Sequence, residues 1–437
     1  MDLETVLLYV LGIVLVLIGL AISIGLHELG HLWPAKRFGV YVSKYMIGFG
    51  PTIWSRRRGE TEYGIKALPL GGYIAMSGMY PPEHAGERMR DSTTSFFDAA
   101  VQEAPPSEDP KRAFYLLPIW KRIVVMLGGP LMNLLLAVVC YAIVLCGFGI
   151  PQVTNLVGSV STCIIPADEV RTECAPGDET APAVAAGIEP GDRVLAINGA
   201  ATTEWLDVAE AIRLHPDQPI EVLVDRGGEQ VSLTARPLLS QNYELGPDGD
   251  VVLDAAGQPQ FVDVGVLGIR PAYENVRQSP LAVAPAVGDN IAAVVGAIAT
   301  LPARVWDLGV AMFGNEERDP NGLVGVVGIG RLAGEITSYE EASVADRASS
   351  IVGILGSLNV ALFLFNLIPL IPLDGGHIFG ALWEGLRRWF ARIRNKPDPG
   401  PLDIQKLAPL TMVVTVLLVG LGAFVILADI IKPISIL

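Results

Sequence analysis

The stretch ISIGLHELGHLWPAKR, residues 22–37, places two histidines and a glutamate at the end of a long apolar run. Residues 6–26 contain no charged side chain, and about 20 apolar residues suffice for a helix to cross the hydrocarbon core of a bilayer. Ionisable groups at that depth are energetically unfavourable unless they have a partner or a ligand. The stretch therefore predicts a membrane-spanning helix that carries a functional site.

Three further uncharged runs, at 123–150, 348–373 and 407–428, bring the number of predicted spans to four. Of the 437 residues, 51% are hydrophobic, and the formal net charge is −15. Together these features predict a polytopic α-helical membrane protein with an acidic part outside the bilayer. Residues 281–306 are also apolar, but proline and charged residues interrupt them. We interpret that stretch as interfacial amphipathic helices rather than as a fifth span.

The distribution of basic residues predicts how the spans are oriented. Lysine and arginine are concentrated between the first two spans and in 387–396, whereas 151–347 contains no lysine. Because basic loops stay in the cytoplasm, both termini and the long middle segment are predicted to face outside a multi-pass cell membrane protein. The predicted segments are span one (1–35), a cytoplasmic region (36–122), span two (123–150), a cysteine loop (151–175), an external domain (176–270), an interfacial region (271–347), span three (348–380), a cytoplasmic loop (381–406) and span four (407–431).

Cys163 and Cys174 lie in the predicted external loop, where oxidation is permitted. We expect a disulfide between them; the alternative is two independent free thiols. Cys140 and Cys146 lie in the second predicted span, where we interpret them as small buried hydrophobic residues.

The segment HELGH, residues 27–31, matches the H-E-x-x-H pattern of metalloproteases. His27 and His31 would project from one face of a helix and share a zinc ion, which in catalytic sites has three protein ligands and an open position for water. Glu28 would take a proton from the attacking water. The structural alternative is a pair of histidines that neighbouring helices satisfy.

A third ligand is expected from FNLIPLIPLDGGH, residues 365–377. Pro369 and Pro372 remove backbone donors, so the helix should break here and bring Asp374 into the site. The alternative is an ordinary helix-capping aspartate. In the second span, Asn133 of GGPLMN is expected near the level of the zinc, where it would bind a substrate carbonyl or oxyanion; an interhelical hydrogen bond is the equal alternative.

The order HELGH, GFGP, PLGGYIAM, GGPLMN and NLIPLIPLDGGH, with an external domain before the last motif, resembles the bacterial site-2 proteases. These are zinc intramembrane metalloproteases of the RseP and Rip type, and the similarity is greatest to actinobacterial members with one PDZ domain. The resemblance implies that one Zn²⁺ is held by His27, His31 and Asp374. It also implies that Glu28 is the catalytic acid and base, and that Asn366 contacts the substrate backbone.

The resemblance also implies a membrane-associated β-hairpin, which fits residues 45–76 with RRRGE as the turn. Residues 77–112 are polar and proline-rich and are expected to form a flexible loop. Residues 176–237 alternate strand-like runs with turns and contain a short amphipathic helix, so this region is expected to be a PDZ-like α/β domain with an extension to residue 270.

The expected function is hydrolysis of peptide bonds inside the membrane-spanning segments of single-span proteins. Anti-sigma factors and signal-peptide remnants are the expected substrates, cut after a first external cleavage by another protease. The PDZ-like domain would act as a size filter, membrane lipid is an expected partner, and nucleic acid is not. The alternatives are a non-catalytic membrane adaptor with a structural zinc and, more weakly supported, a zinc transporter.

Overall fold

The computed structural model describes residues 3–80, 90–93, 110–165, 174–244, 246, 251–254, 258–314, 318–319, 322–340, 342–402 and 408–434. The chain divides into two compact units. We call Met1–Phe148 with Gln278–Leu437 the helical unit and Gly149–Arg277 the β-rich unit. Most of the loop predicted at 77–112 lies outside the described residues.

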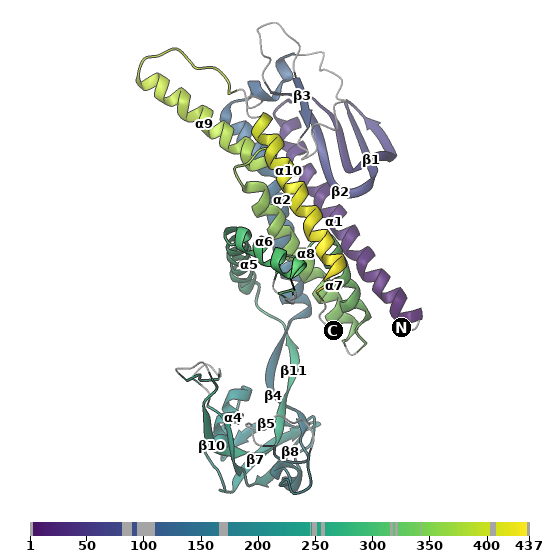
Figure 1. Ribbon diagram of the computed structural model, residues 1–437. Helices are drawn as coiled ribbons and strands as arrows, with labels where there is room; N and C mark the ends of the chain where they lie inside the picture. The colour runs from purple at the N-terminus through teal and green to yellow at the C-terminus, as the bar shows by residue number, and fades with distance from the viewer. Residues whose placement is uncertain are drawn as a thin grey trace. The chain divides into compact units, whose positions relative to one another are not determined.

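The helical unit is built around α1, α2 and α8, which pack against one another (Figure 1). The α2 helix continues into a π-helical turn, Ile143–Phe148. The helices of this unit are α1 (Leu3–Arg37), α2 (Ile119–Ala142), α5 (Val283–Ala299), α6 (Leu301–Phe313), α7 (Val326–Ser338), α8 (Val344–Leu367), α9 (Asp374–Ile393) and α10 (Ala408–Ile431).

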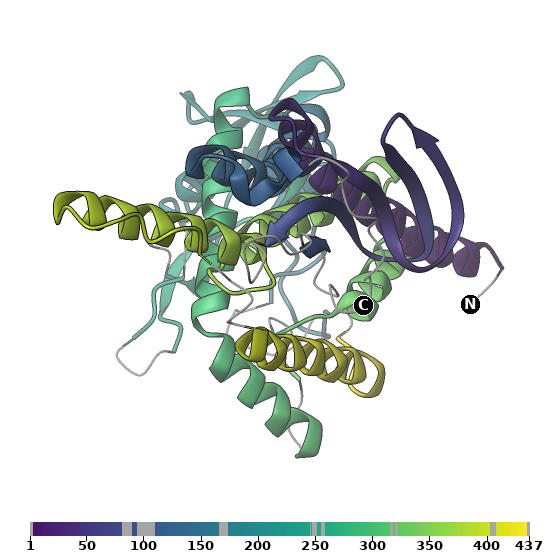
Figure 2. The same ribbon diagram turned by 90° about the horizontal axis from the view of Figure 1, so that it is seen from above.

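Five helical stretches among the described residues are long and apolar enough to cross a membrane. Four of them, Leu3–Arg37, Ile119–Phe148, Val344–Leu367 and Pro409–Ile431, match the expected spans. The fifth, Pro280–Ala299, falls in the region that we expected to be interfacial. It consists mainly of α5, which is seen nearly end-on in Figure 1 and along its length in Figure 2.

The α1 and α2 helices touch through their backbones at a pair of glycines. A Cβ atom built on Gly128 would lie 2.1 Å from the carbonyl oxygen of Gly30, and one built on Gly30 would lie 2.2 Å from that of Gly128. Small residues allow membrane helices to approach this closely. The contact brings the remainder of α2 alongside the HELGH segment.

The predicted helix break is present between Leu367, the end of α8, and Asp374, the first residue of α9. Gly375 is required in the turn, because an added Cβ atom would lie 2.3 Å from the carbonyl oxygen of Ile368. The break leaves Asp374 at the start of a new helix that points in a different direction from α8 (Figure 1).

The predicted hairpin is present but is folded back on itself. β1 (Val42–Arg58) pairs antiparallel with β2 (Thr61–Tyr80), and Arg58 faces Thr61 across the RRRGE turn. Residues 44–47 have partners in both 62–65 and 72–75 of β2, and β3 (Arg90–Thr93) pairs with the far end of β2. Gly48 and Gly50, with φ of 92° and 82°, permit the bend in β1.

Two contacts fix this sheet locally. The Tyr45 hydroxyl donates to the carbonyl of Gly25 at 2.6 Å, which ties β1 to α1 just before the HELGH segment. At the turn, the Arg112 guanidinium donates to both carboxylate oxygens of Glu60 at 2.7 and 2.9 Å. This hydrogen bonding lowers the pKa of Glu60 below its usual value.

The β-rich unit is an α/β fold with an apolar core that includes Val157, Val194, Val222 and Val224. Its main sheet has the order β11-β4-β5-β7-β8, with β6 beside β5, and β9 and β10 form a separate pair. The elements are β4 (Ile150–Val160), α3 (Pro182–Ala186), β5 (Arg193–Ile197), β6 (Ala200–Ala201), α4 (Trp205–Arg213), β7 (Ile220–Arg226), β8 (Glu229–Ala235), β9 (Leu238–Tyr243), β10 (Phe261–Val266) and β11 (Ile269–Val276).

Two details of this unit bear on the sequence predictions. One of the turns expected in 176–237 lies at Asn198–Gly199, with positive φ at both residues, between β5 and β6. The unit begins at Gly149 rather than at 176, because β4 lies between β11 and β5 in the main sheet. The Cys163–Cys174 pair is disulfide-bonded in the structure and lies within this unit.

We predict that Gly128→Ala destabilises the helical unit, because its new methyl group overlaps the α1 backbone. Overpacking of this kind costs about 1–3 kcal/mol, and thermal unfolding in detergent would show it as a lower Tm. Gly420→Ala is the matched control, since it changes a helical glycine with no atom within 4 Å of its built Cβ atom. Equal Tm values for the two variants would contradict the role given to this contact.

Candidate metal centre

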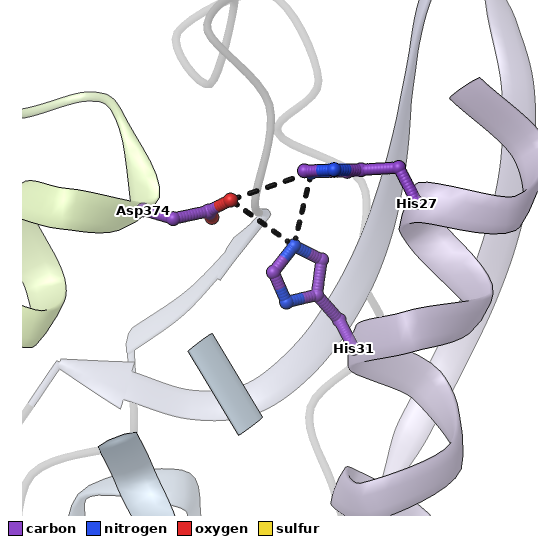
Figure 3. A group of neighbouring side chains, drawn as sticks. All are labelled: His27, His31 and Asp374. Atoms are coloured by element: carbon purple, nitrogen blue, oxygen red, sulfur yellow. Dashed lines mark hydrogen bonds and ion pairs between the residues drawn. The ribbon is translucent and has the colours of Figure 1, made fainter. Parts of the chain in front are cut away.

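His27, His31 and Asp374 converge at one point of the helical unit (Figure 3). The histidines lie one turn apart on α1, and Asp374 reaches them from the start of α9. The Nε2 atoms of the histidines are 3.2 Å apart, and each is 3.3 Å from Asp374 Oδ2. Residues distant in the sequence therefore form a nearly equilateral triangle of ligand atoms.

The outer nitrogens of both histidine rings already have partners. His31 Nδ1 lies 2.8 Å from the carbonyl oxygen of Val125 on α2, so this nitrogen carries a proton and donates it. His27 Nδ1 lies 3.1 Å from the side-chain amide of Asn133, also on α2. With Nδ1 occupied in this way, each ring presents the lone pair of Nε2 to the centre of the triangle.

Lone pairs from two histidines and a carboxylate facing one another repel unless a cation lies between them. His31 is fully buried, Asp374 is 4% exposed, and Asp374 Oδ2 lies 3.3 Å from the Nε2 atom of each histidine. Ligand atoms of a tetrahedral zinc site with bonds of about 2.0 Å are about 3.3 Å apart, which matches the three distances. The donor set and its spacing therefore fit a zinc ion with one position open.

Glu28 follows the first histidine on α1 and is 4% exposed. Gly72 of β2 packs against it, since a Cβ atom built on this glycine would lie 2.9 Å from Glu28 Cγ. A larger residue at position 72 would displace the glutamate. Gly72 of PLGGYIAM thus leaves room for the Glu28 side chain.

Asn133 lies close to the triangle, and its contact with His27 joins α2 to α1, which is the interhelical hydrogen bond that the sequence analysis gave as the equal alternative to a substrate contact. A histidine that binds metal through Nε2 donates its Nδ1 proton, so its partner must be an acceptor. The buried Asn133 Oδ1 atom has no hydrogen-bond partner among the described residues. Because the two ends of an amide are assigned from their partners, we place Oδ1 toward His27.

Asn366 lies half-buried near the end of α8, one residue before the helix stops. Its side chain makes no hydrogen bond among the described residues. Its expected contact with a substrate backbone stays a prediction.

Sequence reasoning missed two features that hold the site together. Gly129 of GGPLMN faces the ligands, because a Cβ atom there would lie 2.2 Å from His31 Nε2. Arg122 on α2 forms a buried, bidentate ion pair with Glu384 on α9, at 3.0 and 2.6 Å. Glu384 also accepts from the backbone N–H of Leu402, so α9 is fixed against α2. In the sequence, Glu384 is an isolated acidic residue just before the basic segment 387–396, and this position could have suggested a buried ion pair.

Comparisons with known proteins agree with this geometry. A model of peptidase family M50 matches residues 15–397. The zinc metalloprotease Rip1 of Mycobacterium tuberculosis is 35% identical over 442 residues, covering 98% of this chain and 99% of the relative. Rip1 of Mycolicibacterium smegmatis is 31% identical over 98% of both chains. Metalloprotease MmpA of Caulobacter vibrioides is 26% identical over 87% of this chain and 88% of its own.

We predict that Asn133→Ala lowers zinc affinity by about 10–100-fold, because it removes the group that orients His27. Competition between the purified full-length protein and a chelator would measure the affinity. The matched control is Asn359→Ala, which removes a buried amide that contacts Ser23 on α1 but no metal-ligating residue. Unchanged zinc affinity in Asn133→Ala would instead favour the original expectation of a substrate contact.

Proposed function

The chain belongs to peptidase family M50 and is a zinc metalloprotease of the site-2 type, and from this premise we propose which residues perform the reaction. His27, His31 and Asp374 hold the zinc, and Glu28 is the general acid and base. The observation that carries the proposal is the buried triangle of ligand atoms with 3.2–3.3 Å edges beside a buried glutamate.

A zinc ion at this site supplies a Lewis acid that polarises the scissile carbonyl and favours deprotonation of water. Glu28 accepts the proton of the attacking water as the new C–O bond forms. It then returns that proton to the amide nitrogen as the C–N bond breaks, so that a carboxylic acid and an amine leave. Asn133 keeps His27 in the tautomer that offers Nε2 to the metal.

We propose that the chain crosses the membrane four times, with α5 and α6 at the outer interface. The orientation of α5 across the other helices supports this topology (Figures 1 and 2). A crossing at Pro280–Ala299 would also bring 387–396, with its five basic residues, to the outside. In the four-span arrangement, both termini and the β-rich unit are extracytoplasmic.

The proposed substrates are membrane-spanning segments of single-span proteins, such as anti-sigma factors or signal-peptide remnants. The folded hairpin supports this proposal, because residues 53–58 of β1 are exposed and pair on one side with 61–65. An unpaired strand edge can hold a substrate in the extended form that hydrolysis needs. Asn366 is proposed to contact the same extended backbone.

We propose that the β-rich unit is PDZ-like and excludes substrates that retain a large external domain. Its apolar core and its short α4 helix beside a sheet support the PDZ-like assignment. A groove of about 640 Å³ lies beside α4 and is lined by Trp205, Arg213 and the disulfide-bonded Cys163 and Cys174. Peptide binding in this groove is the alternative to a purely steric filter.

A non-catalytic adaptor with a structural zinc is the alternative function. A structural zinc site is closed by four ligands and has no use for a buried carboxylate beside them. The described residues of this cluster supply three ligand atoms, and Glu28 lies next to them. Both features favour the protease.

We predict that Glu28→Gln lowers the cleavage of a single-span substrate in detergent by about 10²–10⁴-fold, because it removes the proton acceptor, while zinc content is retained. Asp374→Asn should lose zinc as well as activity. Glu335→Gln, at another buried glutamate, serves as the control and should cleave normally. Equal cleavage by the Glu28→Gln variant and the unaltered protein would refute the mechanism.

We predict that removal of the β-rich unit allows cleavage of substrates with untrimmed external domains. A short linker can replace the unit, because Ile150 and Val276 pair at its two ends. Ala209→Trp is the control: it obstructs the groove and keeps the bulk of the unit. If Ala209→Trp allows cleavage of untrimmed substrates as much as removal of the unit does, then ligand binding in the groove, and not the bulk of the unit, controls substrate access.

A further inference from the structure

The outer part of α9 carries a surface that the proteolytic mechanism does not use. Figures 1 and 2 show α9 projecting away from the other helices of its unit. One face is buried through Ala381 and Glu384. The remaining surface exposes large apolar side chains, namely Phe379, Leu382, Trp383, Leu386, Trp389, Phe390 and Ile393.

This helix is amphipathic and basic rather than uniformly apolar, and it is not one of the five stretches that could span a membrane. The segment RRWFARIRNK, residues 387–396, contains five basic residues and no acidic one, in a chain whose formal net charge is −15. Aromatic and aliphatic side chains mixed with arginine and lysine are typical of helices that lie in the membrane interface.

A pocket of about 450 Å³ lies where α9 ends and the chain turns back. Its walls are Trp383, Phe390 and Pro397, and its cationic groups are Arg387, Arg394 and Lys396. In the described part of the chain, these three cations form no ion pair with a carboxylate, unlike Arg388, which pairs with Glu384. The pocket thus combines apolar walls with uncompensated positive charge.

We propose that α9 lies in the membrane interface and that this pocket binds the headgroup of an anionic phospholipid. The inference rests on the proposed membrane placement, which puts 387–396 on the cytoplasmic side. Arg387, Arg394 and Lys396 would contact the phosphate and any further anionic group, and the exposed apolar side chains would lie against the acyl chains.

The same helix begins with the proposed zinc ligand. Asp374 is its first residue, and the Arg122–Glu384 ion pair fixes its middle against α2. A lipid bound by Arg387 and Arg394 would hold the outer half, where Arg388 pairs with Glu384 of the same helix and Asp398 of the segment that follows it. The helix that presents Asp374 is therefore held by protein contacts at one end and by the membrane at the other.

Lipid binding to the delipidated full-length protein in detergent tests the proposal. Native mass spectrometry would compare phosphatidylglycerol with phosphatidylcholine, using the triple variant Arg387→Gln, Arg394→Gln and Lys396→Gln. Each basic side chain near an anionic lipid surface contributes about fivefold in affinity. We expect the unaltered protein to prefer phosphatidylglycerol by about tenfold or more, and the triple variant to lose most of that preference.

The matched control neutralises Arg236, Arg270 and Arg277 to glutamine, which removes the same charge from exposed positions of the β-rich unit. This variant should keep most of the preference. Equal binding of the two lipids by the unaltered protein, an unchanged preference in the α9 variant, or an equally large loss in the control would each overturn the proposal. Lipid binding is measured without substrate, so failure here is distinguishable from failure of the Glu28 mechanism.

Discussion

The packing of the helical unit holds three ligand atoms 3.2–3.3 Å apart in a buried site, although their lone pairs repel one another. Two imidazole lone pairs and a carboxylate oxygen are unfavourable at this depth unless a cation joins them. A zinc ion held by these three residues would remove that cost, and its open position would serve catalysis. The same ion would link α1, which carries the histidines, to α9, which begins with Asp374.

Several contacts bring His27, His31 and Asp374 together. Gly30 and Gly128 allow α1 and α2 to touch, and the same crossing supplies Val125 and Asn133 to the outer nitrogens of the histidines. Such partners fix the tautomer and orientation of metal-binding histidines. The break after α8 frees Asp374 from the direction of that helix. Precision at the metal therefore comes from backbone contacts that leave little room for larger residues.

The elements around the centre divide the remaining tasks. The folded hairpin places Gly72 against Glu28, and one edge of its strand at 53–58 pairs with no other described strand. The α9 helix couples the site, through Glu384 and Arg122, to a basic amphipathic surface that suits anionic lipid. Zinc, substrate and membrane would thus each be bound by a different side of one small cluster of helices.

The class of chemistry and most of the secondary structure follow from the sequence alone. HELGH and LDGG point to the proposed metal-binding side chains by residue type and spacing, the uncharged runs predict the apolar helices, and the two prolines predict the break before Asp374. These features are local, because they follow from helical periodicity, hydrophobicity and the missing proline N–H.

The surroundings of those side chains depend on how the elements pack in three dimensions. This packing paired Asn133 with His27, set Gly72 and Gly129 against the site, folded the hairpin back on itself, and joined Arg122 to Glu384. It also placed β4 inside the sheet of the β-rich unit, so that this unit begins earlier than predicted. Such pairings join residues far apart in the chain, and their geometry depends on how whole helices and strands pack, which no local pattern records.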